Sequence, residues 1–210
     1  MSEVDIYTMN AMLNKYKINT TERLRHFFTQ VLMESGNGMY VREGEYLLNY
    51  GITQEEYEAR YDKRKYKYIH RGVGYIQTTF AYNHESFAVY LLMTNYPELE
   101  LQHITGVDHN AAQVRENYEN SIIIAKEAGI DVTQYESIAE KGTDYIAKDF
   151  SWEITGYWWE TRNINGIIDT FTGSNSIEVD KITAKVNKDL SPEKYEERRT
   201  KYEEIMGYIR

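Results

Sequence analysis

NTTERLRHFFTQVLMESGNG, residues 19–38, contains the pattern that decides the fold. Asn19 can cap a helix, and Glu22, three residues later, can complete a capping box. Five apolar residues then recur at the spacing of one helical face: Leu24, Phe27, Phe28, Val31 and Leu32. Because Ser35–Gly38 is rich in residues that tolerate left-handed backbone angles, the helix is predicted to end at Glu34.

Glu34 is the first candidate for a catalytic group. By helical phase it lies at the edge of the apolar face, beside His26 and Gln30. A partly apolar surrounding and the negative end of the helix dipole both favour the neutral carboxylic acid. A carboxylic acid that stays neutral near pH 7 is what general acid catalysis requires, so Glu34 is predicted to donate a proton.

A second carboxylate follows the glycine-rich turn. Either Glu43 or Glu45 can face Glu34 across a cleft, with Gly44 and Arg42 keeping this segment polar. Enzymes that cleave glycosidic bonds with inversion need two carboxyl groups far enough apart to admit a water. Such a pair is weak evidence for a catalytic site by itself. The chain has 33 acidic residues, and most pairs of acidic residues lie on the solvated surface.

Four stretches, taken in order, carry a further signal. The first is HFFTQVLMESG at 26–36. The others are RGVGYIQTT at 71–79 with Asn83, WEITGYWW at 152–159 continuing through Asn163 and Asn165, and Val186-Asn187 with Arg198. Together they resemble glycoside hydrolase family 19, the chitinases and phage endolysins of lysozyme-like fold, and the first stretch is similar to the catalytic helix of that family. The resemblance covers roughly residues 19 to 205, nearly the whole chain.

The resemblance implies a fold and a set of roles. It implies a single lysozyme-like catalytic domain over residues 1–210, mostly α with a small β element beside a substrate cleft. Glu34 would be the general acid and Glu43 the general base, with Glu45 as the alternative base, and no metal or cofactor would take part. Substrate would be bound by Arg71, Tyr75, Gln77, Thr79, Asn83, Trp158, Asn187 and Arg198.

Three departures from the family affect the expected sugar contacts. Val73 stands where the family often has arginine, and Thr78 where leucine is usual. Lys188-Asp189 replaces the glycine pair that follows the last asparagine of the family. These differences put details of sugar binding in doubt and leave the implied reaction unchanged.

Structural roles remain open for several of these residues. Gln77 can satisfy backbone groups in a bend, Asn83 can cap a helix, and Arg71 can hold its loop by pairing with a carboxylate. Arg198 is expected by default in a surface ion pair, with contact to the acid-side carboxylate as the alternative. Neighbouring residues on a helix point about 100° apart. One of Trp158 and Trp159 is therefore expected in the core and the other nearer the cleft.

The remaining pattern is mostly helical. Further helices are predicted over 7–16, 53–61 (capped by Thr53), the segment after Asn83, 108–129 (capped by Asp108), 133–145, 148–162, 177–187 and 191–202. Residues 68–79 contain too many glycines for a helix and are interpreted as extended or hairpin pieces that line the groove. Gly72 and Gly74 are expected to let the backbone approach a ligand closely.

Composition limits the classes of function. A length of 210 residues with two prolines and no low-complexity tract suits one domain. Without cysteine, neither disulfides nor thiolate chemistry contribute. The net charge of −9 disfavours nucleic acid as a partner, and the acidic start Met1–Asp5 shows no apolar run typical of a signal peptide or membrane span. Most of the twenty tyrosines are expected to pack between helices, although a tyrosine can also stack on a sugar ring.

The expected function is therefore an endolysin that hydrolyses β-1,4 bonds between N-acetylmuramic acid and N-acetylglucosamine with inversion. By resemblance it would be made in a host bacterial cytoplasm without stable membrane association. A holin-type pore or a virion component would then deliver it to the peptidoglycan. The alternatives are a chitinase acting on a chitin-like polymer and a non-catalytic glycan-binding component of a virion.

Overall fold

A computed structural model describes residues 3–62, 64–65, 67–173 and 175–210. The expectation about the first five residues falls partly on Met1 and Ser2, which lie outside this range. The chain is mostly helical, as predicted. The α-helices are α1 (Glu3–Lys15), α2 (Thr21–Glu34), α3 (Gln54–Ala59), α4 (Ala81–Asn95), α5 (Ala111–Glu127), α6 (Thr133–Lys141), α7 (Thr143–Asp149), α8 (Ser151–Thr161), α9 (Ile164–Ile168), α10 (Ser176–Val186) and α11 (Pro192–Tyr208). Short 3-10 helices are η1 (Glu45–Tyr50), η2 (Tyr68–His70) and η3 (Pro97–Leu99).

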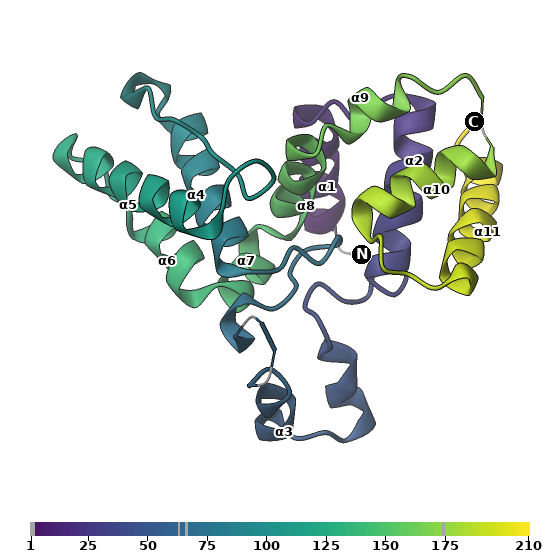
Figure 1. Cartoon of the computed structure of the whole chain (residues 1–210), viewed down its shortest axis with the longest axis horizontal. Helices are drawn as coiled ribbons and strands as arrows, with labels where there is room; N and C mark the ends of the chain where they lie inside the picture. Colours follow the sequence, from purple (N-terminus) through teal and green to yellow (C-terminus); the bar gives the residue numbers. More distant parts are fainter. Residues whose placement is uncertain (1–2, 63, 66, 174) are drawn as a thin grey trace.

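The helices form two groups joined by a central pair. On one side α4 packs against α5 and α6, and α7 continues from α6 (Figure 1). On the other side α2 packs against α10 and α11, with α9 beside them. Helices α1 and α8 pack together between the two groups, while the segment that carries η1 and α3 extends away from both (Figure 1).

The core runs through the central helix α8. Trp159 is fully buried and meets the equally buried Phe27 of α2 edge-on, with ring centroids 5.1 Å apart. Trp158, its neighbour, is only 7% exposed, so the expectation that one of these two rings faces a cleft is wrong. The reason is the position of α8: since neighbouring elements cover it on several sides, side chains 100° apart on the helix are both buried.

Helix α2 confirms the decisive prediction with one correction. It ends at Glu34, as the glycine-rich turn predicts, and Phe27 and Val31 are buried. The N-cap is Thr20 rather than Asn19, because the Thr20 hydroxyl accepts the hydrogen bond from the backbone N–H of Arg23. Glu22 therefore forms no capping box. It pairs instead with Arg25 and accepts a hydrogen bond of 2.7 Å from the hydroxyl of Tyr202.

Other helix boundaries also differ from the predictions. Thr53 caps α3, as predicted, and forms a capping box with Glu56, but the helix ends at Ala59 rather than Tyr61. Helix α5 is capped by Asn110, two residues after the expected Asp108. Asn83 lies inside α4 and is not its cap. The predicted helix over 133–145 is broken at Gly142, whose φ of 57° is left-handed and whose hydrogen lies against the backbone of Ile69.

The expected β element reduces to two isolated bridges in the part of the chain that the structure describes. Val73 bridges antiparallel to Arg42 on one side and to Thr78 on the other. The two segments are held by backbone hydrogen bonds, among them Glu43 N–H to the Gly72 carbonyl at 2.8 Å and Gly74 N–H to the Val41 carbonyl at 2.9 Å. A tight turn with left-handed angles at Gly74 and Gln77 ends this pairing after one bridge on each side.

None of the helices described here combines the length and apolar character that crossing a lipid bilayer requires.

Candidate functional site

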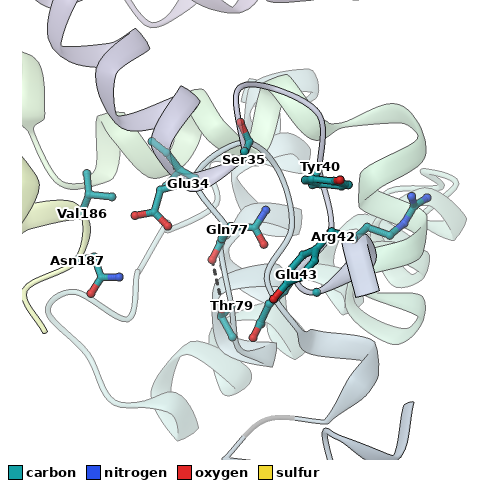
Figure 2. A pocket seen from close by; sticks show the side chains of 13 residues that line it. Glu34, Ser35, Tyr40, Arg42, Glu43, Gln77, Thr79, Val186 and Asn187 are labelled. Carbon is teal, nitrogen blue, oxygen red and sulfur yellow. Dashed lines mark hydrogen bonds between the residues drawn. The ribbon is translucent and has the colours of Figure 1, made fainter. Parts of the chain in front are cut away.

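A cavity of about 510 Å³ opens where the C-terminus of α2 meets the segments after the glycine-rich turn and around Gln77. Figure 2 shows the carboxylate of Glu34 on one side of it and Glu43 on the other, with Gln77 between them in this view. The lining residues are Glu34, Ser35, Gly36, Tyr40, Arg42, Glu43, Gly44, Tyr46, Ile76, Gln77, Thr79, Val186 and Asn187. We call the α2 side the helical wall and the side formed by 40–46 the loop wall.

Glu34 is held on the helical wall by an arginine from the end of the chain. Arg198 of α11 donates from Nη2 to Oε1 of Glu34 and from Nη1 to Oε1 of Gln30. The Gln30 amide in turn donates to the hydroxyl of Thr183 on α10, at 3.2 Å. Since Arg198 is only 4% exposed, its default assignment to a surface ion pair is wrong, and it lies behind Glu34 without lining the cavity.

Glu43 is held on the loop wall through both its backbone and its side chain. Its carboxylate accepts hydrogen bonds from the backbone N–H of Gly72 at 3.0 Å and from Nη1 of Arg64 at 2.9 Å. Its backbone carbonyl accepts from the hydroxyls of Tyr57 and Tyr61. These contacts fix the position of Glu43 in a segment that lacks regular secondary structure.

The two tyrosine hydroxyls remain neutral donors near pH 7. Burial raises the pKa of Tyr57, and the nearby Arg71 guanidinium opposes that shift only in part. Burial, followed by the charge of Glu43, also raises the pKa of Tyr61. Each therefore keeps the proton that it donates to the Glu43 carbonyl.

Glu45, the alternative base, lies elsewhere. It pairs with Nη1 of Arg42 at 2.9 Å, and Arg42 also lies 3.1 Å from Asp144 through its Nε. Glu45 lines a neighbouring cavity of about 310 Å³ rather than the one that contains Glu34 and Glu43. The geometry therefore favours Glu43 as the partner of Glu34.

Three of the expected substrate-binding residues line the cavity: Gln77, Thr79 and Asn187. The Gln77 amide donates to the Gly74 carbonyl at 3.0 Å, so its nitrogen serves the bend, as the structural alternative expects. The Thr79 hydroxyl donates to the Gln77 carbonyl at 2.9 Å (Figure 2). Asn187 directly follows α10 and presents its amide to the cavity from the helical wall.

Arg71 and Tyr75 do not reach this cavity. Arg71 is 1% exposed, donates to Asp144 at 2.7 Å and to the Tyr57 hydroxyl at 3.0 Å, and lies 3.8 Å from the centroid of the Tyr68 ring. It holds its loop, as its structural alternative expects. Tyr75 stacks on Trp152 with ring centroids 3.8 Å apart and borders a separate cavity of about 640 Å³.

Asn83 and Trp158 also lie away from the cavity. The Asn83 amide donates to the Thr79 carbonyl at 2.6 Å, which ties α4 to the segment that lines the cavity. Trp158 is buried and packs under the guanidinium of Arg162, 4.1 Å from its ring centroid. Asn83 therefore supports the site through a hydrogen bond with a lining residue, and Trp158 contributes to the core.

The glycines of the 71–79 segment contact protein rather than open space. A Cβ at Gly72 would lie 2.8 Å from Oε1 of Gln77, and one at Gly74 would lie 2.7 Å from Cγ2 of Ile154. The expectation that these glycines let a ligand approach the backbone is therefore wrong. They let the bend pack against the Gln77 side chain and helix α8.

The sequence interpretation missed Tyr40 and Tyr46, which both line the cavity. Both occur in the segment already singled out for its carboxylates, YVREGEYLLNY at 40–50, and a tyrosine beside a candidate catalytic residue was a usable signal. The general expectation that tyrosines pack between helices assigned no binding role to these two residues.

Within the described ranges, no three His, Asp or Glu side chains come together in a way that could hold a metal ion. Comparisons with protein-family models, with curated proteins and with solved structures find no match.

Proposed function

We propose that the chain is a glycoside hydrolase that cleaves β-1,4 bonds between N-acetylated sugars by an inverting, two-carboxylate mechanism. One observation carries the proposal. Glu34 and Glu43, from two walls of different construction, line the same cavity together with the amides of Gln77 and Asn187. Two carboxyl groups flanking a cavity that can hold sugar and water are the groups that such hydrolysis needs.

In this mechanism Glu34 protonates the leaving oxygen and Glu43 activates a water on the opposite face of the sugar. Arg198 occupies Oε1 of Glu34, which leaves Oε2 for the proton. The guanidinium stabilises the carboxylate that forms as the proton leaves.

Glu43 is suited to the role of base by its contacts. Gly72 N–H and Arg64 both donate to its carboxylate, and neither bond needs a proton from Glu43. Both groups therefore orient a carboxylate that accepts hydrogen bonds, as a base must when it takes a proton from water.

The resemblance to glycoside hydrolase family 19 supplies the finer part of the proposal. It covers a lysozyme-like cleft with a small β element, here represented by the bridges at Val73, and peptidoglycan as the substrate. The short glycine-rich turn and the absence of cysteine resemble the endolysin branch more than the secreted plant branch. Synthesis in a host cytoplasm, with release through a holin-type pore or delivery in a virion, belongs to the same proposal.

The test is hydrolysis of purified cell walls by the wild-type protein and by Glu34→Gln. Glutamine keeps an oxygen for Arg198 and has no proton to donate, so the release of reducing ends should fall by about 10²–10⁴-fold while binding to the walls is retained. Glu197→Gln, an exposed acid on α11, is the matched control and should retain activity. Equal activity of Glu34→Gln and wild type would refute the proposal.

Two measurements separate the alternatives. Mass spectrometry of the products identifies the new reducing sugar and hence the bond cut, and parallel digestion of chitin distinguishes a chitinase. NMR of the first product distinguishes inversion from retention. A wild-type protein that binds walls and releases no sugar would be a glycan-binding component instead.

A further inference from the structure

Three tyrosine rings lead out of the cavity along the loop wall. Tyr40 and Tyr46 have ring centroids 5.9 Å apart, and Tyr46 and Tyr50 have centroids 6.4 Å apart. Tyr40 and Tyr46 line the cavity, whereas Tyr50 lies beyond it. Exposure increases outward: Tyr46 is 45% exposed and Tyr50 is 80% exposed.

The element that carries the two outer rings has no buried residue of its own. Helix η1 reads EYLLNY, and none of its six residues is buried. Two tyrosines on a short helix that is exposed to solvent bury little apolar area, so they contribute little to the stability of the core. Continuity of these rings with a cavity that contains two carboxylates indicates a binding role for this surface.

We propose that Tyr40, Tyr46 and Tyr50 form an aromatic ladder that binds a single glycan strand beyond the bond being cut. This proposal rests on the proposed hydrolase function and adds the part of the substrate that lies outside the cavity. A sugar ring presents an apolar face that stacks on a tyrosine ring, and the phenol hydroxyl can bond to the rim of the sugar. Successive ring spacings of 5.9 and 6.4 Å are of the order of one pyranose unit.

The ring planes indicate the physical state of that strand. The planes of Tyr40 and Tyr46 differ by 60°, and those of Tyr46 and Tyr50 differ by 81°. Rings that lie flat on the surface of a crystalline polysaccharide must be close to coplanar. The ladder therefore suits an isolated, twisted strand such as that of peptidoglycan and does not suit the face of a chitin crystal.

The test measures binding of glycan strands that are freed of peptides and separated by length. Binding is measured on the Glu34→Gln background, so that hydrolysis does not consume the strands. Tyr46→Ala and Tyr50→Ala should each raise the Kd for long strands roughly three- to tenfold, with a smaller increase for short strands. Tyr50→Phe, which keeps the ring face, should restore most of the affinity.

Tyr208→Ala is the matched control, since Tyr208 of α11 is 81% exposed, as much as Tyr50. Equal Kd values of Tyr50→Ala and Tyr208→Ala for long strands would overturn the ladder. Tighter binding of the Glu34→Gln protein to crystalline chitin than to soluble strands would also overturn it. Failure of the two proposals can be told apart. If the wild-type protein cuts cell walls but Tyr46→Ala and Tyr50→Ala leave the Kd for long strands unchanged, only the ladder is refuted. If the wild-type protein cuts nothing but the tyrosine variants still bind long strands more weakly, only the hydrolase proposal is refuted.

Discussion

The two walls of the cavity present a carboxylate each and are built in different ways. Glu34 belongs to a regular helix whose apolar face packs into the core, and its side chain is fixed by Arg198 from α11. Glu43 belongs to a segment without a regular element, and two tyrosine hydroxyls and a backbone N–H hold it. A helix fixes a side chain through periodic packing, whereas a loop must fix it by individual hydrogen bonds.

The largest expected difference is between the two acidic residues of the loop wall. Glu43→Gln should reduce the release of sugar from cell walls by about 10²–10⁴-fold, because the amide cannot accept a proton from water. Glu45→Gln should leave the rate within a small factor, because Glu45 lines a different cavity. Assay of both variants on the same cell-wall preparation tests this prediction. A larger loss of activity for Glu45→Gln would make Glu45 the base instead of Glu43.

The helical wall depends on one buried ion pair. Arg198→Ala should lower the free energy of unfolding by about 3–5 kcal/mol, because it leaves Gln30 and Glu34 without their charged donor. Arg199→Ala is the control on the adjacent residue: Arg199 pairs with Asp180 and Glu196 at the surface and should contribute less than about 1 kcal/mol. Urea denaturation measures the free energy of unfolding of both variants. Equal decreases would contradict the prediction that the buried Arg198 stabilises the fold more than the surface Arg199.

Two buried histidines, one on α2 and one on α4, make the stability of the fold dependent on pH. Burial lowers the pKa of His26 on α2 to about 4 and that of His84 on α4 to about 3, against an ordinary value of 6.5. Above pH 6.5 both rings are neutral in the folded and unfolded states. Below it the unfolded chain binds protons that the folded chain excludes, so stability falls as the pH falls.

At pH 4 the loss from His26 should reach about 3 kcal/mol relative to pH 7. Within the described structure neither ring nitrogen of His26 has a hydrogen-bond partner, and the ring packs against Phe171 and Tyr202. His26→Phe should therefore keep the packing and reduce the acid sensitivity. Thermal melts between pH 4 and 7 measure this, and an unchanged pH profile would contradict the prediction for His26.

A smaller effect is expected from the hydroxyl of Tyr57 on α3, which supports the loop wall from behind. Tyr57→Phe removes the donor to the Glu43 carbonyl and the acceptor for Nε of Arg71, so it should cost about 1–3 kcal/mol. Its effect on sugar release should exceed its effect on binding of the Glu34→Gln protein, because it displaces the base. Tyr208→Phe, at an exposed site, should change stability by less than about 0.5 kcal/mol. No difference between the two variants would mean that other contacts hold Glu43.

The sequence predicted the helical wall better than the loop wall, for a physical reason. The apolar repeat from Leu24 to Leu32 and the turn after Glu34 are local signals, and α2 ends where they indicate. The cap at Thr53 is an equally local signal, and its prediction is confirmed. The contact of Arg198 with Glu34 joins residues 164 positions apart, so no periodic pattern reports it.

On the loop wall the choice between Glu43 and Glu45 depends on which way two nearby side chains point. The Glu43 carboxylate is directed by hydrogen bonds from Gly72 and Arg64, neither of which has a fixed spacing from Glu43. Trp158 illustrates the same limit, because its burial depends on how many neighbours surround α8. Single side chains on irregular segments follow tertiary packing, which a motif does not encode.

The link between Arg198 and Glu34 has a consequence for the order in which the site is completed during synthesis. Translation makes α2 before α11, so a nascent chain carries the acidic residue long before the ribosome supplies the arginine that holds it. The helical wall can reach its final form only when α11 has left the exit tunnel and docked on α2.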